Sequence, residues 1–178
     1  MTPKNEQWKH GIGGLAMISD SGNRTEFETG AVRDIQEGKG RCDLLPLDIV
    51  NAITRRKILE LLAEFQRTLE KENLYKALEE FIENCFAKEE DALLELSIHF
   101  EEGAIKYGEY NWQKGIPYSR YIDSAVRHYL KFLRNDTDER HDRAFMWNIV
   151  CLIWTVENKP EMNDLVKRKK DEELCLNG

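Results

Sequence analysis

The sequence has no apolar run near the length of about 20 residues that a transmembrane helix requires. Its first residues, MTPKNEQWKHGIGG, also lack the apolar core of a secretion signal, so we expect a cytoplasmic protein without a membrane partner. Cysteine is scarce, and no two cysteines have CxxC spacing. A zinc or disulfide framework is therefore not expected, and free thiols are predicted for the four cysteines, Cys42, Cys85, Cys151 and Cys175.

Positive charge is in short supply as well. The chain has 26 Lys and Arg against 33 Asp and Glu, a net charge of -7, which argues against binding of nucleic acid or of an anionic membrane. A small phosphorylated ligand is still possible, since a few local cations suffice for it. The GxSxG and HExxH motifs are missing, and GKGR at 38–41 lacks the spacing and the Ser/Thr of a Walker loop.

What the sequence does contain is helical periodicity. With 178 residues, 41% of them hydrophobic, the chain is long enough for one domain with a real core. From Leu47 onward, apolar residues recur at helical intervals, whereas the residues before about 48 are glycine-rich and aperiodic. These patterns predict an all-α fold, a helical bundle of about five helices with a loop-rich N-terminal arm.

The domain boundaries follow from the same patterns. We expect a flexible N-terminal tail at 1–25, a single all-α domain at 26–160 and a charged C-terminal tail at 161–178. Within the domain, residues 52–87 form an extra amphipathic helical pair, which either caps a pocket or builds an oligomer interface. Aromatic helical faces offer more apolar surface than a lone bundle hides, so a homo-oligomer is expected.

The helical hairpin at 99–133 carries an unusual assortment of charges. Glu102 and Lys106 are four residues apart, as are Asp123 and Arg127, and the plain interpretation of each pair is a solvated salt bridge.

Glu101 has a different sequence context. It falls on the helical stripe of Leu94, Ile98 and Ile105, so we expect this acid or its neighbour to lie at the edge of a buried surface. A carboxylate in such a place needs a cation, and a divalent metal is one candidate.

The last helical stretch places His141, Ala144, Asn148 and Cys151 on one face. Asn148 lies in an apolar run, where a buried amide must find partners. Either it makes a structural hydrogen bond to a neighbouring helix, or it faces a base, a sugar or a ligated water. His128 and His141 could also join Asp142 in an HD-type metal site.

A basic glycine-containing segment, GAVRDIQEGKGRCDLLP, occupies 30–46. Glycines there allow backbone N–H groups to approach an anion closely, although basic glycine turns are also common on surfaces. The charged residues of this segment are Arg33, Asp34, Lys39, Arg41 and Asp43, of which the two acids either hold the arginines or ligate a metal.

Three segments together, 30–46, 101–133 and 141–154, resemble the bacteriophage-associated dATP/dGTP diphosphohydrolase-like proteins. The shared pattern includes G-A-x-R-D, E-G-A-x-K-Y-G-x-x-N-W, D-x-x-x-R-H and H-x-x-A-x-x-W-N. The resemblance implies kinship with the all-α, MazG-like nucleotide pyrophosphohydrolases, which hold Mg²⁺ with carboxylates and split a nucleoside triphosphate into monophosphate and pyrophosphate. A phage-encoded protein would act in the host cytoplasm.

This resemblance implies a set of site residues for a purine nucleotide and Mg²⁺. The expected catalytic acids are Glu101, Glu102 and Asp123, with Glu102 and Asp123 as the metal ligands. The expected phosphate ligands are Lys39, Arg41, Lys106 and Arg127. The residues expected nearest the sugar and base are Asn111, Trp112, His128 and Asn148, and His141 is grouped with them. The residues expected at the loop that closes the pocket are Arg33, Asp34 and Asp43.

One departure from the related enzymes keeps an alternative open. The EExxE and ExxD motifs are absent in that form, because Ile105 stands where the third acid is expected. The chain could instead be a non-catalytic anti-defence protein that sequesters a host signalling nucleotide, either a cyclic dinucleotide or an ADP-ribose derivative. A purely structural helical assembly protein is the third alternative.

Overall fold

A computed structural model describes residues 22–165, so most of both predicted tails, 1–25 and 161–178, lies outside the described residues. The elements follow one another as β1 (Arg24–Glu26), β2 (Val32–Asp34), η1 (Cys42–Leu44), α1 (Leu47–Thr54), α2 (Lys57–Thr68), α3 (Glu72–Cys85), α4 (Glu89–Tyr107), η2 (Asn111–Lys114), α5 (Tyr118–Arg134), α6 (His141–Asn158) and η3 (Pro160–Met162).

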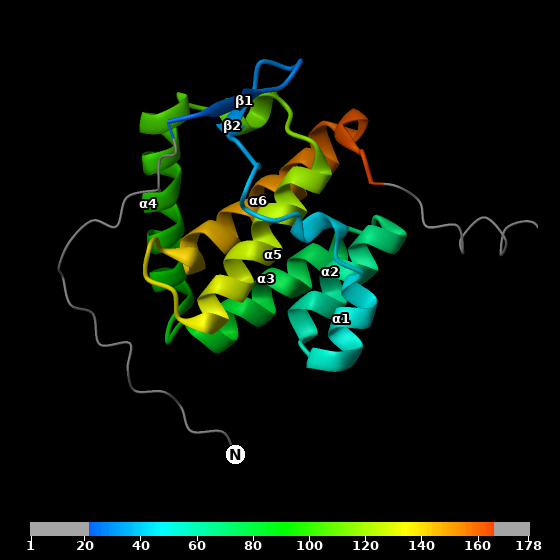
Figure 1. The fold of residues 1–178 in the computed structure, drawn as a ribbon. Coiled ribbons are helices and arrows are strands. Elements are labelled where there is room, and N and C mark those ends of the chain that lie inside the picture. Colours follow the sequence, from blue (N-terminus) through cyan, green and yellow to red (C-terminus); the bar gives the residue numbers. More distant parts are fainter. Residues whose placement is uncertain (1–21, 166–178) are drawn as a thin grey trace, which may run out of the picture.

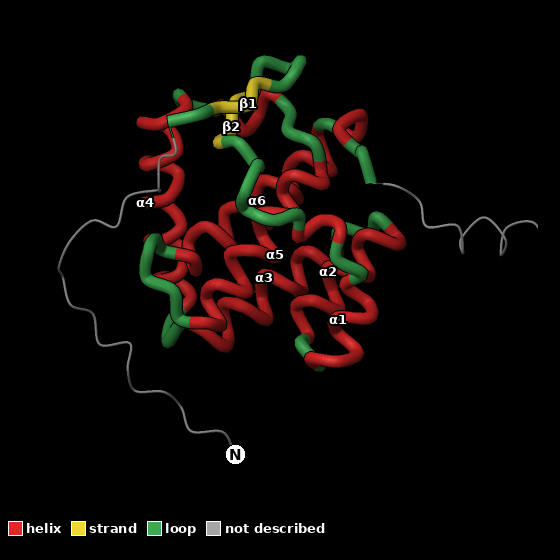
Figure 2. Tube along the Cα trace, viewed as in Figure 1, coloured by secondary structure: helices red, strands yellow, loops and turns green. Residues whose placement is uncertain are grey.

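The predicted all-α fold is confirmed, since helices make up most of the described chain (Figure 2). The described residues form six α-helices rather than about five, because Leu47–Thr54 is a separate short helix. The arm contains one small antiparallel ladder in which Arg24 pairs with Asp34 and Glu26 with Val32. Strands of three residues are too short to show an alternating pattern in the sequence. No helix in the described part is long and apolar enough to span a membrane.

α5 and α6 form the centre of the molecule, with α4 on one side and α1 and α2 on the other (Figure 1). α5 is amphipathic, and its buried stripe includes Tyr121, Ile122, Ala125 and Val126 at helical spacing. α6 is buried on almost every side, as expected of a helix surrounded by others. α5 ends at Arg134, and the following Asn135 adopts the left-handed conformation that asparagine tolerates at a helix C-terminus.

The extra helices at 52–87 belong to this core. Leu59, Leu62 and Phe65 of α2 and Leu74 of α3 are fully buried. The ring of Phe81 lies 4.4 Å, centroid to centroid, from that of Phe145, which ties α3 to α6.

The stripe that was expected to flank Glu101 is not buried. Leu94 and Ile105 are 65% and 73% exposed, and Glu101 itself is exposed. α4 is instead rotated so that Ala92, Leu96 and His99 face the core. The expected buried edge is therefore found at the neighbour Glu102, whose side chain is 9% exposed, and not at Glu101. α4 has apolar residues on two helical stripes, and the stripe that contains Ala92 and Leu96 is the buried one.

Apolar side chains also remain exposed elsewhere in the described residues. Ile49 and Ile53 on α1 are 57% and 78% exposed, and Leu93 on α4 is 52% exposed. Nothing in a single chain tests whether a second copy covers them, so the homo-oligomer stays a prediction.

The N-terminal arm is attached to the helical core by hydrogen bonds to its backbone. The amide of Asn111 donates to the carbonyl of Val32 and accepts from its N–H, both at 2.9 Å. Thr29 donates its hydroxyl to the carbonyl of Gly115 at 2.5 Å, and the carboxylate of Asp123 accepts from the N–H of Cys42 at 2.7 Å. These contacts bring residues 29–42 across the ends and faces of α4, α5 and α6.

The double hydrogen bond of Asn111 leads to a prediction. Asn111→Ala should lower the free energy of unfolding by about 1–3 kcal/mol, because the buried side chain satisfies both backbone groups of Val32. Urea denaturation measures the change. The matched control is Gln113→Ala on the same short helix, where we expect less than about 0.5 kcal/mol. Equal effects of the two substitutions would contradict this role of Asn111.

Candidate functional site

A cavity of about 400 Å³ lies between the N-terminal arm and the three helices α4, α5 and α6. Residues 32–39 of the arm line one side of it. Its volume is within the range of sites for small organic ligands. The arm therefore does more than cover the core, because it forms a wall of the cavity.

Helical spacing explains which side chains reach this cavity. α4 contributes His99, Gly103 and Tyr107, which are four residues apart. A Cβ added at Gly103 would meet no atom within 4 Å, so this glycine leaves room in the wall. α5 and α6 contribute the largest group, which consists of Arg120, Ser124, Arg127, His128, Lys131, Ala144, Trp147 and Asn148.

The cavity is rich in positive charge although the chain is acidic. Five lysines and arginines line it against three carboxylates, whereas the whole chain carries a net charge of -7. The carboxylates are Asp34, Asp138 and Glu139, and two of them have cationic partners, Asp34 beside Lys106 and Asp138 beside Lys131. Such a lining favours an anionic ligand.

Arg33 is a partly buried cation that the arm contributes to the cavity wall. Its guanidinium donates to Asn148 Oδ1 at 2.9 Å and to Ser124 Oγ at 3.3 Å. It also lies over the rings of Trp147 and Tyr121, 5.5 and 5.3 Å from their centroids. Burial lowers the pKa of Arg33, yet within residues 22–165 it has no carboxylate partner.

Arg120 is a second cation of this kind. It is partly buried on α5, and its side chain makes no ion pair with a described residue. Burial, and then the nearby charge of Arg33, lower the pKa of the Arg120 guanidinium. Burial likewise lowers the pKa of Lys39, whose ammonium lies 3.6 Å from Asp34. The three cations therefore lie in surroundings that an added anion would stabilise.

Asp34 fixes the arm in place. Its carboxylate accepts hydrogen bonds from Lys106 at 3.0 Å, from the Tyr107 hydroxyl at 3.0 Å and from Arg24 at 3.1 Å. These contacts join β2 to the end of α4. The sequence left open whether Asp34 holds basic residues or ligates a metal, and these contacts support the first role.

Three polar atoms in the cavity wall are buried without a hydrogen-bond partner among the described residues. They are Gln36 Nε2, His99 Nδ1 and Trp147 Nε1. Buried polar groups in native proteins are nearly always satisfied, so unsatisfied groups that share one cavity mark places where a ligand or water binds.

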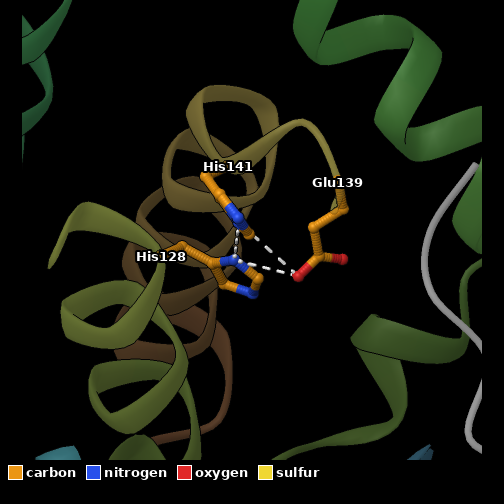
Figure 3. A group of neighbouring side chains, drawn as sticks. All are labelled: His128, Glu139 and His141. Atoms are coloured by element: carbon orange, nitrogen blue, oxygen red, sulfur yellow. Dashed lines mark hydrogen bonds and ion pairs between the residues drawn. The ribbon is translucent and has the colours of Figure 1, made fainter. Parts of the chain in front are cut away.

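His128, Glu139 and His141 meet at the edge of the cavity, where the loop from α5 enters α6 (Figure 3). The two imidazole Nδ1 atoms are 3.0 Å apart, and Glu139 Oε1 lies 3.4 Å from His128 Nδ1 and 3.6 Å from His141 Nδ1. Burial, and then the charge of Arg127, hold the pKa of His128 well below its usual value.

The HD-type alternative is corrected by this geometry. His128 and His141 do come together, but their third neighbour is Glu139. Asp142 instead accepts two hydrogen bonds from Arg140, at 3.0 and 2.6 Å, because its side chain leaves the first turn of α6 in another direction.

Most of the predicted binding residues do converge. Those that line the cavity are Arg33, Asp34, Lys39, Asn111, Arg127, His128 and Asn148. Lys106 and His141 lie behind them, in contact with Asp34 and His128 respectively. Asn148 bonds both within its own helix, to the carbonyl of Ala144, and to the arm through Arg33.

Three other predicted binding residues do not line the cavity. Arg41 and Asp43 form an ion pair with each other at η1, with contacts of 2.7 and 2.5 Å. Trp112 packs against Trp154, with ring centroids 5.0 Å apart, and against Phe100. Arg41 and Asp43 thus neutralise each other within the arm, and the Trp112 ring packs in the core.

The expected catalytic acids are not brought together either. Glu102 Oε1 lies 3.6 Å from Arg143, and its other oxygen lies 3.9 Å from His99. Asp123 accepts from Arg127 at 2.7 Å, which is the plain salt bridge that the spacing also allowed, and from the Cys42 N–H.

These surroundings do not fit the implied Mg²⁺. Both carboxylates already face cations, neither lines the cavity, and within residues 22–165 they share no cluster of potential metal ligands. Hard Mg²⁺ requires oxygen ligands arranged around one point.

Several cavity residues were not predicted from the sequence, although two of them lie on the helix that carries the D-x-x-x-R-H motif. Arg120 and Lys131 fall seven residues before and four after Arg127, on one face of α5. His99 and Trp147 were assigned no binding role, and Glu139 belongs to a polar connection without periodicity. Only the fold brings that connection beside His128.

The fold and the cavity define an all-α protein with a cation-lined cavity between its arm and its central helices. Residues 84–165 match the family model described as "dATP/dGTP diphosphohydrolase, N-terminal". The match supports the predicted resemblance over the segment that contains α4, α5 and α6. The comparisons with curated proteins and with solved structures gave no significant match.

The surroundings of His99 predict a pH dependence of stability. Burial, and then the charge of Arg143, lower the pKa of His99 to about 4. The unfolded chain therefore binds a proton below about pH 6.5 that the folded protein excludes until about pH 4. Stability present above pH 6.5 should fall on acidification, with a contribution from this group of up to about 1.4 kcal/mol per pH unit.

Urea denaturation at pH 7, 6 and 5 measures this dependence. His99→Gln removes the titrating group and should flatten the decline between pH 6.5 and 5 relative to the unsubstituted protein. His128 remains in both proteins, so the comparison isolates His99. Parallel curves would show that His99 is not the group responsible.

Proposed function

We propose that the cavity binds a purine deoxynucleoside triphosphate, dATP or dGTP, and that the protein hydrolyses it to the monophosphate and pyrophosphate. The observation that carries the proposal is the pair of guanidinium groups, Arg33 and Arg120, that face one cavity without a carboxylate partner among the described residues. The matched family name supports the choice of a nucleotide.

The energetic argument starts from these cations. Removing a charge from water costs free energy unless an opposite charge replaces the lost hydration. A triphosphate supplies several negative charges, and its oxygens match the planar donor set of a guanidinium. Lys39 and Arg127, on the arm and on α5, lie at the same cavity and would share the phosphates.

The nucleoside would use the remaining donors. The indole Nε1 of Trp147 and the imidazole Nδ1 of His99 are both buried, and neither has a hydrogen-bond partner in the described chain. Their rings are 5.8 Å apart, centroid to centroid, so both could contact one bound sugar or base. Preference for a purine rests on the family description alone.

In the proposed reaction, a water oxygen forms a bond to the α-phosphorus while the bond from that phosphorus to the bridging oxygen of the β-phosphate breaks. Pyrophosphate leaves with the electron pair, and the water protons pass to solvent or to a base. The chain's own cations would hold the phosphates in line and stabilise the charge that develops on their oxygens. Glu102 and Asp123 would not hold Mg²⁺ at these phosphates, because both carboxylates face cations and neither lines the cavity.

The position of the expected catalytic acids outside the cavity favours a second function. Since Glu101, Glu102 and Asp123 do not line the cavity, the protein could bind a nucleotide without hydrolysing it. The ligand would then be a host-defence signalling nucleotide, either a cyclic dinucleotide or an ADP-ribose derivative, and a phage that encodes the protein would benefit from its sequestration.

Chromatography of bound and released material separates the two functions. The protein is incubated with the four deoxynucleoside triphosphates, a cyclic dinucleotide and ADP-ribose, with and without divalent cations, and is then denatured. We expect dATP or dGTP to give equal amounts of monophosphate and pyrophosphate. Quantitative recovery of an intact bound nucleotide would instead establish sequestration, and neither binding nor turnover would refute both.

Arg120 provides the sharpest test of the binding site. Arg120→Gln should weaken dATP binding about 10- to 100-fold, since it removes a charged donor to a phosphate. Isothermal titration calorimetry measures the affinity, and circular dichroism confirms the fold. The control Arg56→Gln removes an exposed arginine at the start of α2, outside the cavity, and should leave the affinity unchanged. Equal affinities of both variants would rule out phosphate binding by Arg120.

A further inference from the structure

The cluster of His128, Glu139 and His141 has the dimensions of a metal site (Figure 3). Its three potential ligand atoms are 3.0, 3.4 and 3.6 Å apart. A tetrahedral ion bound at about 2.0–2.1 Å holds its ligand atoms about 3.3 Å from one another. We propose that these three residues bind a divalent transition-metal cation of the Zn²⁺ class at the rim of the cavity.

Asp138 prepares His141 for this role. Its Oδ1 lies 2.8 Å from His141 Nε2, and since a carboxylate accepts, this ring nitrogen carries the proton. His141 Nδ1 is then the unprotonated nitrogen, and it points toward His128 and Glu139. A carboxylate that orients a ligating histidine in this way is a common outer contact of protein metal sites.

Lys131 holds that carboxylate in turn. Its ammonium lies 2.7 Å from Asp138 Oδ2. The Asp138 carboxylate therefore contacts Lys131 through one oxygen and His141 through the other, and both contacts fix its position.

The nature of the ligand atoms indicates the class of metal. Two imidazole nitrogens and one carboxylate oxygen suit Zn²⁺ and other first-row transition ions, whereas Mg²⁺ and Ca²⁺ prefer oxygen alone. Three protein ligands also leave a fourth position for water or substrate. His128 and Glu139 line the cavity, so a metal held between them would lie beside the space that the ligand occupies.

A neighbouring cluster offers a less suitable ligand set. Asp136, Asp138 and His141 also lie within reach of one another. However, Asp136 forms an ion pair with Arg134, and Asp138 is engaged by Lys131. In the proposed site, by contrast, the carboxylate of Glu139 has its described contacts to the two imidazoles.

Metal binding by this site does not depend on the nucleotide. Contact of the bound metal with a phosphate oxygen rests on the proposed function, but the affinity for the metal itself does not. The two can therefore be measured separately, with Zn²⁺ alone in one experiment and dATP on chelator-treated protein in the other.

The test uses the full-length chain after removal of metals with a chelator. We expect one equivalent of Zn²⁺ by calorimetry, and intense visible bands of tetrahedral coordination when Co²⁺ replaces it. His128→Gln and Glu139→Gln should each weaken Zn²⁺ binding by about tenfold or more. The matched control Asp136→Asn should leave it within about twofold, since Asp136 belongs only to the neighbouring cluster.

Several results would overturn the site. They are the absence of stoichiometric Zn²⁺ binding, a loss in Asp136→Asn that equals the loss in the two ligand variants, or unchanged affinity in both ligand variants. If the ligand variants do not fold, X-ray absorption of the unsubstituted Zn²⁺ complex decides, because two imidazoles give a distinct scattering pattern. Absence of that pattern contradicts the proposal. If Zn²⁺ does not bind but the metal-free protein still binds dATP, the metal site has failed while the nucleotide site of the proposed function stands.

Discussion

Hydrogen bonds from helical side chains to the backbone of the N-terminal arm are the contacts on which the cavity depends. Asn111 pairs with both polar groups of Val32, and Asp123 receives the N–H of Cys42. Asp34 adds an ionic contact from the arm to α4. Ala31 of the arm is buried in the core and Phe27 packs against it, and together with the polar contacts they hold the arm as a wall against the helices.

The same wall concentrates positive charge in an acidic protein. Arg33 comes from the arm, whereas Arg120 and Arg127 come from α5, and the closed arm brings all three to one space. Aromatic rings and amide oxygens partly replace the water that Arg33 loses. Because no carboxylate in the described chain neutralises it, the arrangement favours binding of an external anion over a closed network of internal ion pairs.

Much of the fold and part of the site could be read from local patterns. The apolar stripe of α5 predicts which face of this helix is buried. Arg127 and His128 are consecutive residues of the same helix, so the sequence also predicts that they lie close together. Asn148 was expected to be buried with a partner, and it is. The spacing of Asp123 and Arg127 was equally compatible with a metal ligand and with a salt bridge, and only the position of Cys42 shows that this acid holds the arm.

The sequence by itself determined the helical class, the glycine-rich arm and the similarity of residues 84–165 to the diphosphohydrolase family model, because these depend on periodicity and on motifs that are contiguous in the chain. Tertiary structure decided which face of α4 is buried, which acids are already paired, and that Glu139 from an aperiodic loop meets His128 and His141. Spacing along one helix fixes which residues share a face. The direction of that face depends on packing against segments far away in the sequence.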